Sequence, residues 1–258
     1  MNLFDFSGRV VIVTGASSGL GAQAAIAFAE HGASVVLAAR RKEKLEALEQ
    51  EINQKEQGQA YALACDVASE EQVASMVQQV KEKYGKVDVL INNAGIAIGG
   101  GVDTLTDEAW DHIIDINVKG VARVSKHVVP LMKEAGYGRI INVASINALL
   151  ADKSQSLWRH AYNTTKAAVL GLTKGMAASY TQFGITTNAV CPGLFPSEMT
   201  EDTLFKATEF LNMYNALCPA ARPAKKDELN STFLYFASEG SAYVSGQEIV
   251  VDGGFSIV

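Results

Sequence analysis

Cysteine and proline are both scarce in this chain, and each scarcity excludes a class of protein. Three cysteines in 258 residues, with no C-x-x-C pair, indicate neither a disulfide framework nor a zinc site. Five prolines and the lack of a proline- or glycine-rich linker leave no candidate domain boundary. We therefore expect one domain over residues 1–258, with no bound metal, working in a reducing compartment, the cytoplasm.

Long apolar runs and positive charge are missing as well. The longest apolar runs have the length of a strand, and the first residues lack the features of a secretion signal, so we expect no membrane span. The net charge of −6 disfavours nucleic acid or an anionic membrane as a partner. With 48% apolar and 19% charged residues, the chain has enough apolar side chains to form a large buried core.

Short runs rich in β-branched residues alternate with stretches of helical periodicity. Leu45, Leu48 and Ile52 mark one such helix, and Ser69 with Gln72 form a capping box at the start of the next. Uniformly apolar strands separated by helices form parallel sheets covered on both faces. The pattern predicts an α/β fold, a doubly wound parallel sheet of seven strands at 10–14, 34–39, 60–65, 87–92, 139–144, 186–191 and 248–251.

Residues 194–217 form a long connection rich in apolar side chains. Long connections in compact domains are usually functional, so we predict a substrate-binding lid here. Phe195, Met199 and Phe205 are its expected substrate contacts. The alternative is an ordinary helix packed on the core.

A glycine-rich turn follows the first predicted strand and precedes a helix. It reads Thr14-Gly15-Ala16-Ser17-Ser18-Gly19-Leu20-Gly21. Glycines let the backbone approach a pyrophosphate, and a helix N-terminus offers free N–H groups and positive potential. The turn therefore indicates a dinucleotide site, with a simple tight turn as the alternative.

The spacing G-x-x-x-G-x-G resembles the short-chain dehydrogenase/reductase family. The resemblance continues in order along nearly the whole chain, through Asp66-Val67, Asn92-Asn93-Ala94-Gly95, Asn117, Ser145, Tyr162-x-x-x-Lys166 and Pro192-Gly193. It implies a Rossmann-type fold, a nicotinamide cofactor and the interconversion of a carbonyl and an alcohol. It also implies cofactor contacts at Gly15, Ser17, Ser18, Gly19, Leu20, Gly21, Asp66, Val67, Asn93, Ala94, Gly95, Tyr162, Lys166, Pro192, Gly193, Leu194 and Ser197.

The choice between NADP and NAD depends on the end of the second strand. NAD enzymes place a carboxylate about 20 residues past the glycines to bind the ribose 2′-hydroxyl. Here the sequence has Arg40 and Arg41, and no acid before Glu43. Guanidinium groups form bidentate charge-assisted bonds with phosphate, so NADP is expected and NAD is less favoured.

Tyr162 and Lys166 are four residues apart on a predicted helix and share one face. A phenol has a pKa of about 10, but an ammonium about 4 Å away is worth roughly 4 kcal/mol at an effective dielectric constant of 20. Lys166 is therefore predicted to lower the pKa of Tyr162, which acts as general acid or base. Ser145 is expected to donate a hydrogen bond to the substrate oxygen. The resemblance implies that Asn117 holds a water for proton relay.

Two other enzyme classes find little support. Ser145 lacks the G-x-S-x-G elbow of a hydrolase, and the four histidines lack metal-ligand spacing. A non-catalytic protein that senses NADP is the alternative of another class, disfavoured because Asn117, Ser145, Tyr162 and Lys166 are all present.

The sequence constrains the identity of the substrate less than the type of reaction. The interval between Ser145 and Tyr162 is longer than usual in the family, and Trp158 within it is a candidate to cap the substrate pocket. The apolar lid favours a bulky apolar or cyclic ketone, and a sugar or polyol is a second candidate. A 3-oxoacyl thioester on an acidic carrier protein is the third, weakened by the acidic character of the chain.

Assembly into a homotetramer or homodimer is expected from the resemblance. Ala161, Thr165, Ala168 and Leu172 form a stripe of mainly small residues that permits close helix approach. Burial of this stripe in the subunit core is the alternative.

Overall fold

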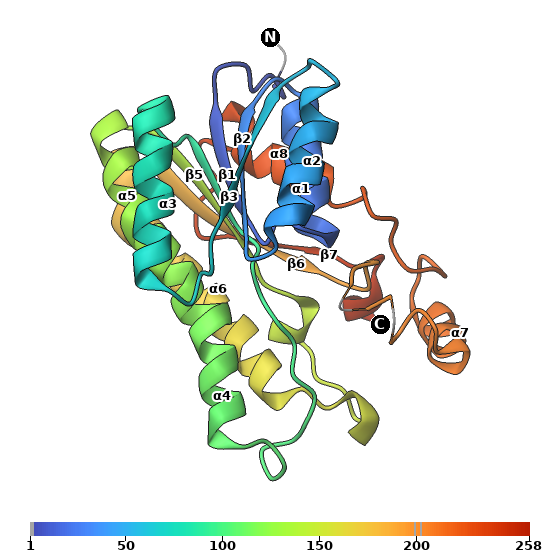
Figure 1. Cartoon of the computed structure of the whole chain (residues 1–258). Helices are drawn as coiled ribbons and strands as arrows, with labels where there is room; N and C mark the ends of the chain where they lie inside the picture. Colours follow the sequence, from blue (N-terminus) through green and yellow to red (C-terminus); the bar gives the residue numbers. More distant parts are fainter. Residues whose placement is uncertain (1–2, 199, 202) are drawn as a thin grey trace.

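The computed structural model describes residues 3–198, 200–201 and 203–258, and its centre is a parallel sheet (Figure 1). The seven strands lie in the order β3-β2-β1-β4-β5-β6-β7, and every pair is parallel. This is the predicted Rossmann-type α/β fold. The strands are β1 (Val10–Thr14), β2 (Ser34–Ala39), β3 (Gln59–Ala64), β4 (Val89–Asn92), β5 (Gly138–Val143), β6 (Ile185–Pro192) and β7 (Glu248–Val251).

Helices cover both faces of the sheet (Figure 1). Alternate residues of β1 show why: Val11 and Val13 join one apolar cluster, whereas Val10 and Ile12 join the other. The first face carries α1 (Gly19–Glu30), α2 (Lys42–Asn53) and α8 (Asn230–Ala237). The second carries α3 (Glu70–Tyr84), α5 (Gly120–Ala135) and α6 (His160–Tyr180), with α4 (Asp107–Ile114) running into α5.

The predicted capping box is present in part. Ser69 caps α3 by accepting from the Gln72 backbone N–H at 3.3 Å. The Gln72 side chain accepts instead from the Asp66 N–H at 2.9 Å. Gln72 thereby fixes Asp66, two residues after the end of β3, at the sheet edge where the predicted site residues gather.

The segment after β6 does not fold onto the sheet as the other connections do. It leads to α7 (Thr208–Leu217), which lies to one side of the sheet and near the C-terminus (Figure 1). Leu194, Tyr214 and Cys218 are buried together there, in what we call the lid cluster. Its partly buried members are Leu204, Phe205, Phe210, Leu211 and Phe255. Among the described residues, no helix is long and apolar enough to cross a membrane.

Candidate active site

A cleft of about 420 Å³ opens at the carboxyl ends of the strands. In a parallel sheet these ends share one edge, so residues far apart in sequence meet there. The strand order reverses between β1 and β4, and the cleft lies at this switch point. Residues that follow six different strands line it, among them Gly15, Arg40, Asp66, Asn93, Ser145 and Gly193.

The N-terminus of α1 faces this cleft without a side-chain cap. Ser18 occupies the cap position but its side chain accepts no backbone N–H, and the first turn has no acidic residue. Gly19 adopts a left-handed φ of +55° there, a conformation that favours glycine. Unpaired N–H groups at a helix start attract an anion, so the turn fits the pyrophosphate of a dinucleotide.

Thr14 and Asn93 join the glycine-rich turn to the end of β4. Thr14 Oγ1 accepts from the N–H groups of Asn93 at 3.0 Å and Ala94 at 3.1 Å. The Asn93 amide donates back to Thr14 O at 3.0 Å. The sequence analysis does not predict this role of Thr14, although a polar residue at the end of an apolar strand could have indicated it.

Gly21 packs the start of α1 on the glycine-rich turn and does not line the cleft. A Cβ at this position would lie 2.5 Å from Gly15 O and 2.5 Å from Asn93 Nδ2. Gly21→Ala is therefore expected to lower the free energy of unfolding by about 1–3 kcal/mol through overpacking. Urea denaturation measures this.

The matched control for that prediction is Gly99→Ala, at an exposed position where a Cβ would lie 3.8 Å from Trp158 O. This is an ordinary van der Waals distance, so the variant should be as stable as the wild type or more so. A Gly21→Ala protein as stable as the wild type would show that the close packing of turn and helix has been misjudged.

Arg40 and Arg41 line the end of the cleft beyond β2, as the sequence predicts for a 2′-phosphate site. Arg41 Nη2 donates to Ser17 Oγ at 2.8 Å and to Ser18 Oγ at 3.1 Å. Its Nη1 pairs with Glu198 Oε2 at 2.7 Å. Sequence reasoning missed Glu198, because no local pattern reveals an ion pair between such distant parts of the chain.

Ser145, Tyr162 and Lys166 line the other end of the cleft. Ser145 follows β5 and its hydroxyl accepts from the Asn147 N–H at 3.1 Å. Tyr162 is in the first turn of α6, and Lys166 follows one turn later. Lys166 Nζ donates to Val143 O at 2.8 Å and lies 5.6 Å from the centre of the Tyr162 ring. The structure thus brings together three of the four residues that the sequence assigns to the chemistry.

Asn117 lies behind this group, in a π-helical turn (Asp115–Lys119) between α4 and α5. Such turns are frequent at functional sites. Its buried side chain accepts from Ile96 N at 2.8 Å and donates to Ile96 O at 2.9 Å and Thr165 Oγ1 at 3.0 Å. Asn117 therefore fixes the chain after β4 against α6; its part in a proton relay stays a prediction.

Burial dominates the acid–base behaviour of the pair. It raises the pKa of Tyr162, against the opposing effects of the Ser145 hydroxyl and the Arg159 charge. It also lowers the pKa of Lys166 to about 8. The prediction that Lys166 brings the pKa of Tyr162 below its usual value is wrong for this structure, because the loss of solvent outweighs the nearby charges.

The predicted substrate contacts divide into three groups. Phe195 lines the cleft together with Ser145 and Tyr162, whereas Met199 lies outside the described residues. Phe205 packs in the lid cluster and does not line the cleft. Trp158 does not line it either: its ring lies over Gly101 and 5.5 Å from the ring of His160.

Most predicted cofactor residues line the cleft, and two do not. Leu194 is buried in the lid cluster, and Gly21 packs beneath the turn. The predicted residues that line it are Gly15, Ser17, Ser18, Gly19, Leu20, Arg40, Arg41, Asp66, Val67, Asn93, Ala94, Gly95, Tyr162, Lys166, Pro192, Gly193 and Ser197. Lining residues without a predicted role are Ala39, Cys65, Ile96, Ile116, Val143, Ala144, Glu198 and Thr200.

Comparison with known proteins gives the same classification. The family model described as enoyl-(acyl carrier protein) reductase matches residues 15–256. The 3-oxoacyl-(acyl-carrier-protein) reductase FabG of Thermotoga maritima is 36% identical over 252 residues, covering 97% of this chain and 98% of the relative.

Solved structures agree over the full length. A putative gluconate dehydrogenase from Agrobacterium tumefaciens superposes with a TM-score of 0.95 at 32% identity, covering 100% of both chains. A gluconate 5-dehydrogenase from Burkholderia cenocepacia, solved with NADP and tartrate, gives 0.93 at 33% identity, covering 100% of this chain and 98% of that one. The chain belongs to the short-chain dehydrogenase/reductase family of oxidoreductases.

Proposed function

We propose that the protein is a cytoplasmic NADP-dependent oxidoreductase that interconverts a ketone and a secondary alcohol. One observation carries the proposal: a single cleft holds Arg41 at one end and Ser145, Tyr162 and Lys166 at the other. A dinucleotide with a 2′-phosphate fits the charges of the first end. The second end offers a proton donor where a carbonyl would sit.

The residues present suit the cofactor at each part of the cleft. The uncapped N–H groups of α1 would hold the pyrophosphate, and Arg40 and Arg41 the 2′-phosphate. At the other end, Lys166 would hold the nicotinamide ribose. Ser197, beside the glycine-rich turn, would hold the carboxamide or phosphates of the cofactor. When bound, the nicotinamide supplies or accepts the hydride.

The chain itself moves the proton. During reduction, the Tyr162 hydroxyl gives its proton to the carbonyl oxygen, and Ser145 Oγ donates a hydrogen bond to the same oxygen. The raised pKa of Tyr162 keeps the phenol protonated at neutral pH, the form that reduction needs. The phenolate left behind lies at the N-terminus of α6 and near the Lys166 ammonium, and both stabilise negative charge.

A small hydroxylated substrate, of the sugar or polyol class, is the first candidate. Of the aromatic residues that favoured a bulky apolar ketone, Phe195 lines the cleft, whereas Phe205, Phe210 and Tyr214 pack in the lid cluster. The cleft therefore has few aromatic contacts for a bulky apolar group, which favours the sugar or polyol class. The similarity to gluconate dehydrogenases supports the same class.

A 3-oxoacyl thioester on a carrier protein is the second candidate, supported by the similarity to FabG. An acidic carrier needs unpaired basic residues near the cleft. On α5, Arg123 pairs with Asp115 at 2.6 Å, and Lys126 pairs with Glu70 at 2.6 Å. This pairing weakens the second candidate.

A spectrophotometric screen tests the proposal. Polyols, sugar acids, cyclic ketones and 3-oxoacyl thioesters are each offered with NADPH or NADH and the matching oxidised forms, and absorbance of the reduced nicotinamide is followed. Turnover with a ketone or secondary alcohol and a preference for NADP is expected. Binding of NADPH without turnover of any compound would favour the cofactor-sensing alternative.

We also propose that the subunits assemble through α6, as a homotetramer or homodimer. Ala161 and Thr165, half of the stripe singled out in the sequence, are fully buried in the subunit core. A neighbouring stripe at heptad spacing is exposed instead: Thr164, Ala168, Gly171, Gly175 and Ala178. Small exposed side chains allow two helices to approach closely.

Gly171→Glu is expected to break this assembly. Glutamate is a better helix former than glycine, and nothing lies within 4 Å of the position, so the subunit itself should stay folded. Light scattering should report a mass near that of one chain, 27.5 kDa, against two or four times that mass for the wild type. A wild-type monomer, or a variant that assembles as before, would refute the proposed interface.

A further inference from the structure

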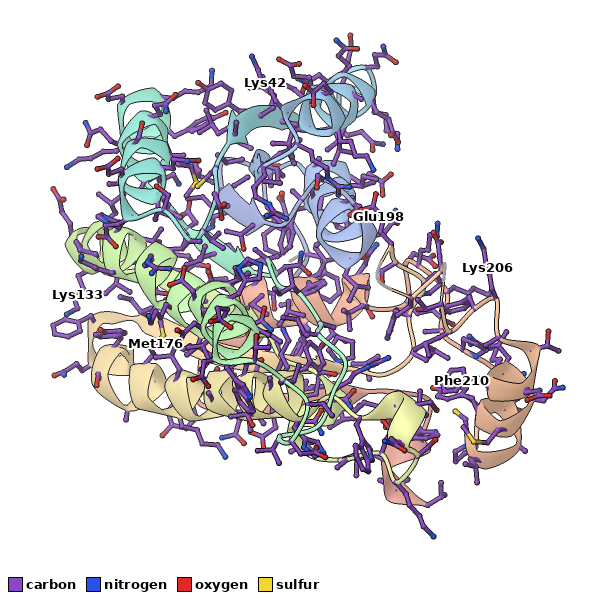
Figure 2. The ribbon with its side chains drawn as sticks, turned by 60° about the horizontal axis from the view of Figure 1, so that its bottom comes forward. Lys42, Lys133, Met176, Glu198, Lys206 and Phe210 are labelled. Carbon is purple, nitrogen blue, oxygen red and sulfur yellow. The ribbon has the colours of Figure 1, made fainter. Side chains whose placement is uncertain are left out.

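The Glu198 carboxylate occupies the end of the cleft where the 2′-phosphate of NADP is proposed to bind. One oxygen lies 2.7 Å from Arg41 Nη1 and accepts from Ser18 Oγ at 3.1 Å. The other pairs with Lys44 Nζ. In Figure 2, Glu198 lies where the segment after β6 meets the blue helices at the start of the chain. The carboxylate is thus an internal anion among the donors expected to hold a phosphate.

The Glu198 carboxylate is ionised at neutral pH. The hydrogen bond from Lys44, with those from Arg41 and Ser18, lowers its pKa to about 2 against the opposing effect of burial. Arg41 cannot bind a phosphate and this carboxylate equally well at once, because both require the same guanidinium edge. A 2′-phosphate therefore competes with Glu198 for Arg41.

The position of Glu198 also connects this competition to the lid. Its neighbour Ser197 touches the glycine-rich turn: a Cβ on Gly19 would lie 3.1 Å from Ser197 Cβ. Ser197, Glu198 and Thr200 all line the cleft, at the start of the segment 194–217. The ion pairs of Glu198 thus attach this segment to α2 and to the cofactor turn.

We propose that Glu198 is a specificity-determining residue that reduces the preference for NADP over NAD, an inference that rests on the proposed function. NADP displaces the carboxylate from Arg41 and Lys44. NAD, with no 2′-phosphate, leaves those ion pairs in place, and the carboxylate accepts a hydrogen bond from the free 2′-hydroxyl. Glu198 then binds the ribose 2′-hydroxyl from the lid, as a carboxylate at the end of the second strand does in NAD enzymes.

Glu198→Gln tests the proposal, with Glu201→Gln as the matched control. Glu201 belongs to the same segment but pairs with Lys226 at 2.9 Å and does not line the cleft. Binding of NADPH and NADH is titrated by nicotinamide fluorescence. In Glu198→Gln the Kd of NADPH should fall about threefold to tenfold, because two exposed ion pairs no longer compete, and the Kd of NADH should not fall. Glu201→Gln should match the wild type.

Arg41→Ala separates this inference from the proposed function. The proposed function predicts that Arg41→Ala weakens NADPH and spares NADH. The inference adds that Glu198→Gln has a smaller effect in the Arg41→Ala background, where only the competition for Lys44 remains. If Arg41→Ala behaves so but Glu198→Gln leaves the ratio of the two Kd values unchanged, Glu198 is no specificity determinant and the function stands. If the wild type binds neither dinucleotide, both proposals fail.

Discussion

Replacing Tyr162 by phenylalanine is expected to lower kcat by about a thousandfold and to leave the Kd of NADPH nearly unchanged. The substitution removes only the hydroxyl, which is the proposed proton donor to the substrate oxygen, and general acid–base catalysis contributes about 10²–10⁴-fold. The ring keeps its place in the first turn of α6 beneath Lys166. Steady-state kinetics with the best substrate of the screen, together with a fluorescence titration of NADPH, measure both quantities.

Tyr180→Phe is the control for this substitution. Tyr180 ends the same helix, and its ring contacts Lys133 rather than the cleft. It should retain wild-type turnover. If Tyr162→Phe kept more than about a tenth of the wild-type kcat, well above the range for a lost general acid, another group would have to supply the proton.

Replacing Lys166 by methionine is expected to lower kcat/KM for reduction by about a hundredfold. Its Nζ lies 5.6 Å from the centre of the Tyr162 ring. At about that distance and an effective dielectric constant of 20, a unit charge pair is worth about 3 kcal/mol, or two powers of ten. Methionine keeps the length and apolar stem of the side chain, so the loss reports mainly the charge.

The pH dependence distinguishes this role from a structural one. Burial lowers the pKa of Lys166 to about 8, so the ammonium is present below that pH and lost above it. In the wild type, kcat/KM for ketone reduction should be constant below pH of about 7 and should fall as pH rises through about 8. This alkaline decline should disappear in Lys166→Met.

Lys174→Met is the control, because Lys174 lies on the same helix, is exposed and pairs with Glu248 at 3.8 Å. It should retain the wild-type pH profile. A decline near pH 8 that persists in Lys166→Met would assign the titration to another group and remove Lys166 from the proton chemistry.

The strands were predictable because each is a short apolar run between turns. β1, β2 and β7 coincide with the predicted segments, and β3 and β5 are displaced by one residue. That these runs form one parallel sheet could be inferred because helices join the successive strands. That all carboxyl ends share one edge then follows from geometry, which is why motif residues after six strands meet in the cleft.

What could not be predicted depends on contacts between distant segments. The ion pair of Glu198 with Arg41 joins two loops that no periodicity relates. The aromatic residues of the segment 194–217 look equally suited to a substrate or to one another, and only the fold shows that Phe205 packs in the lid cluster. The exposed face of α6 differs from the predicted stripe because sequence spacing does not reveal which side of a helix meets the core.

The pKa values of the catalytic pair show the same limit. Their spacing predicts the electrostatic attraction between Lys166 and Tyr162, but the loss of solvent depends on everything packed around them. Burial raises the pKa of Tyr162 and lowers that of Lys166, so it shifts both groups toward their neutral forms, although Lys166 is still an ammonium below a pH of about 8.

The central claim is that Tyr162 gives a proton to a carbonyl oxygen in the cleft, where a bound reduced nicotinamide would supply hydride to the carbonyl carbon. Mass spectrometry of the product formed with NADPH deuterated at the transferring position of the nicotinamide tests it most directly. The claim predicts an alcohol with one deuterium bound to the carbinol carbon, formed by the wild type and lost with Tyr162→Phe. An alcohol without deuterium at that carbon, or equal labelled product from Tyr162→Phe, would contradict it.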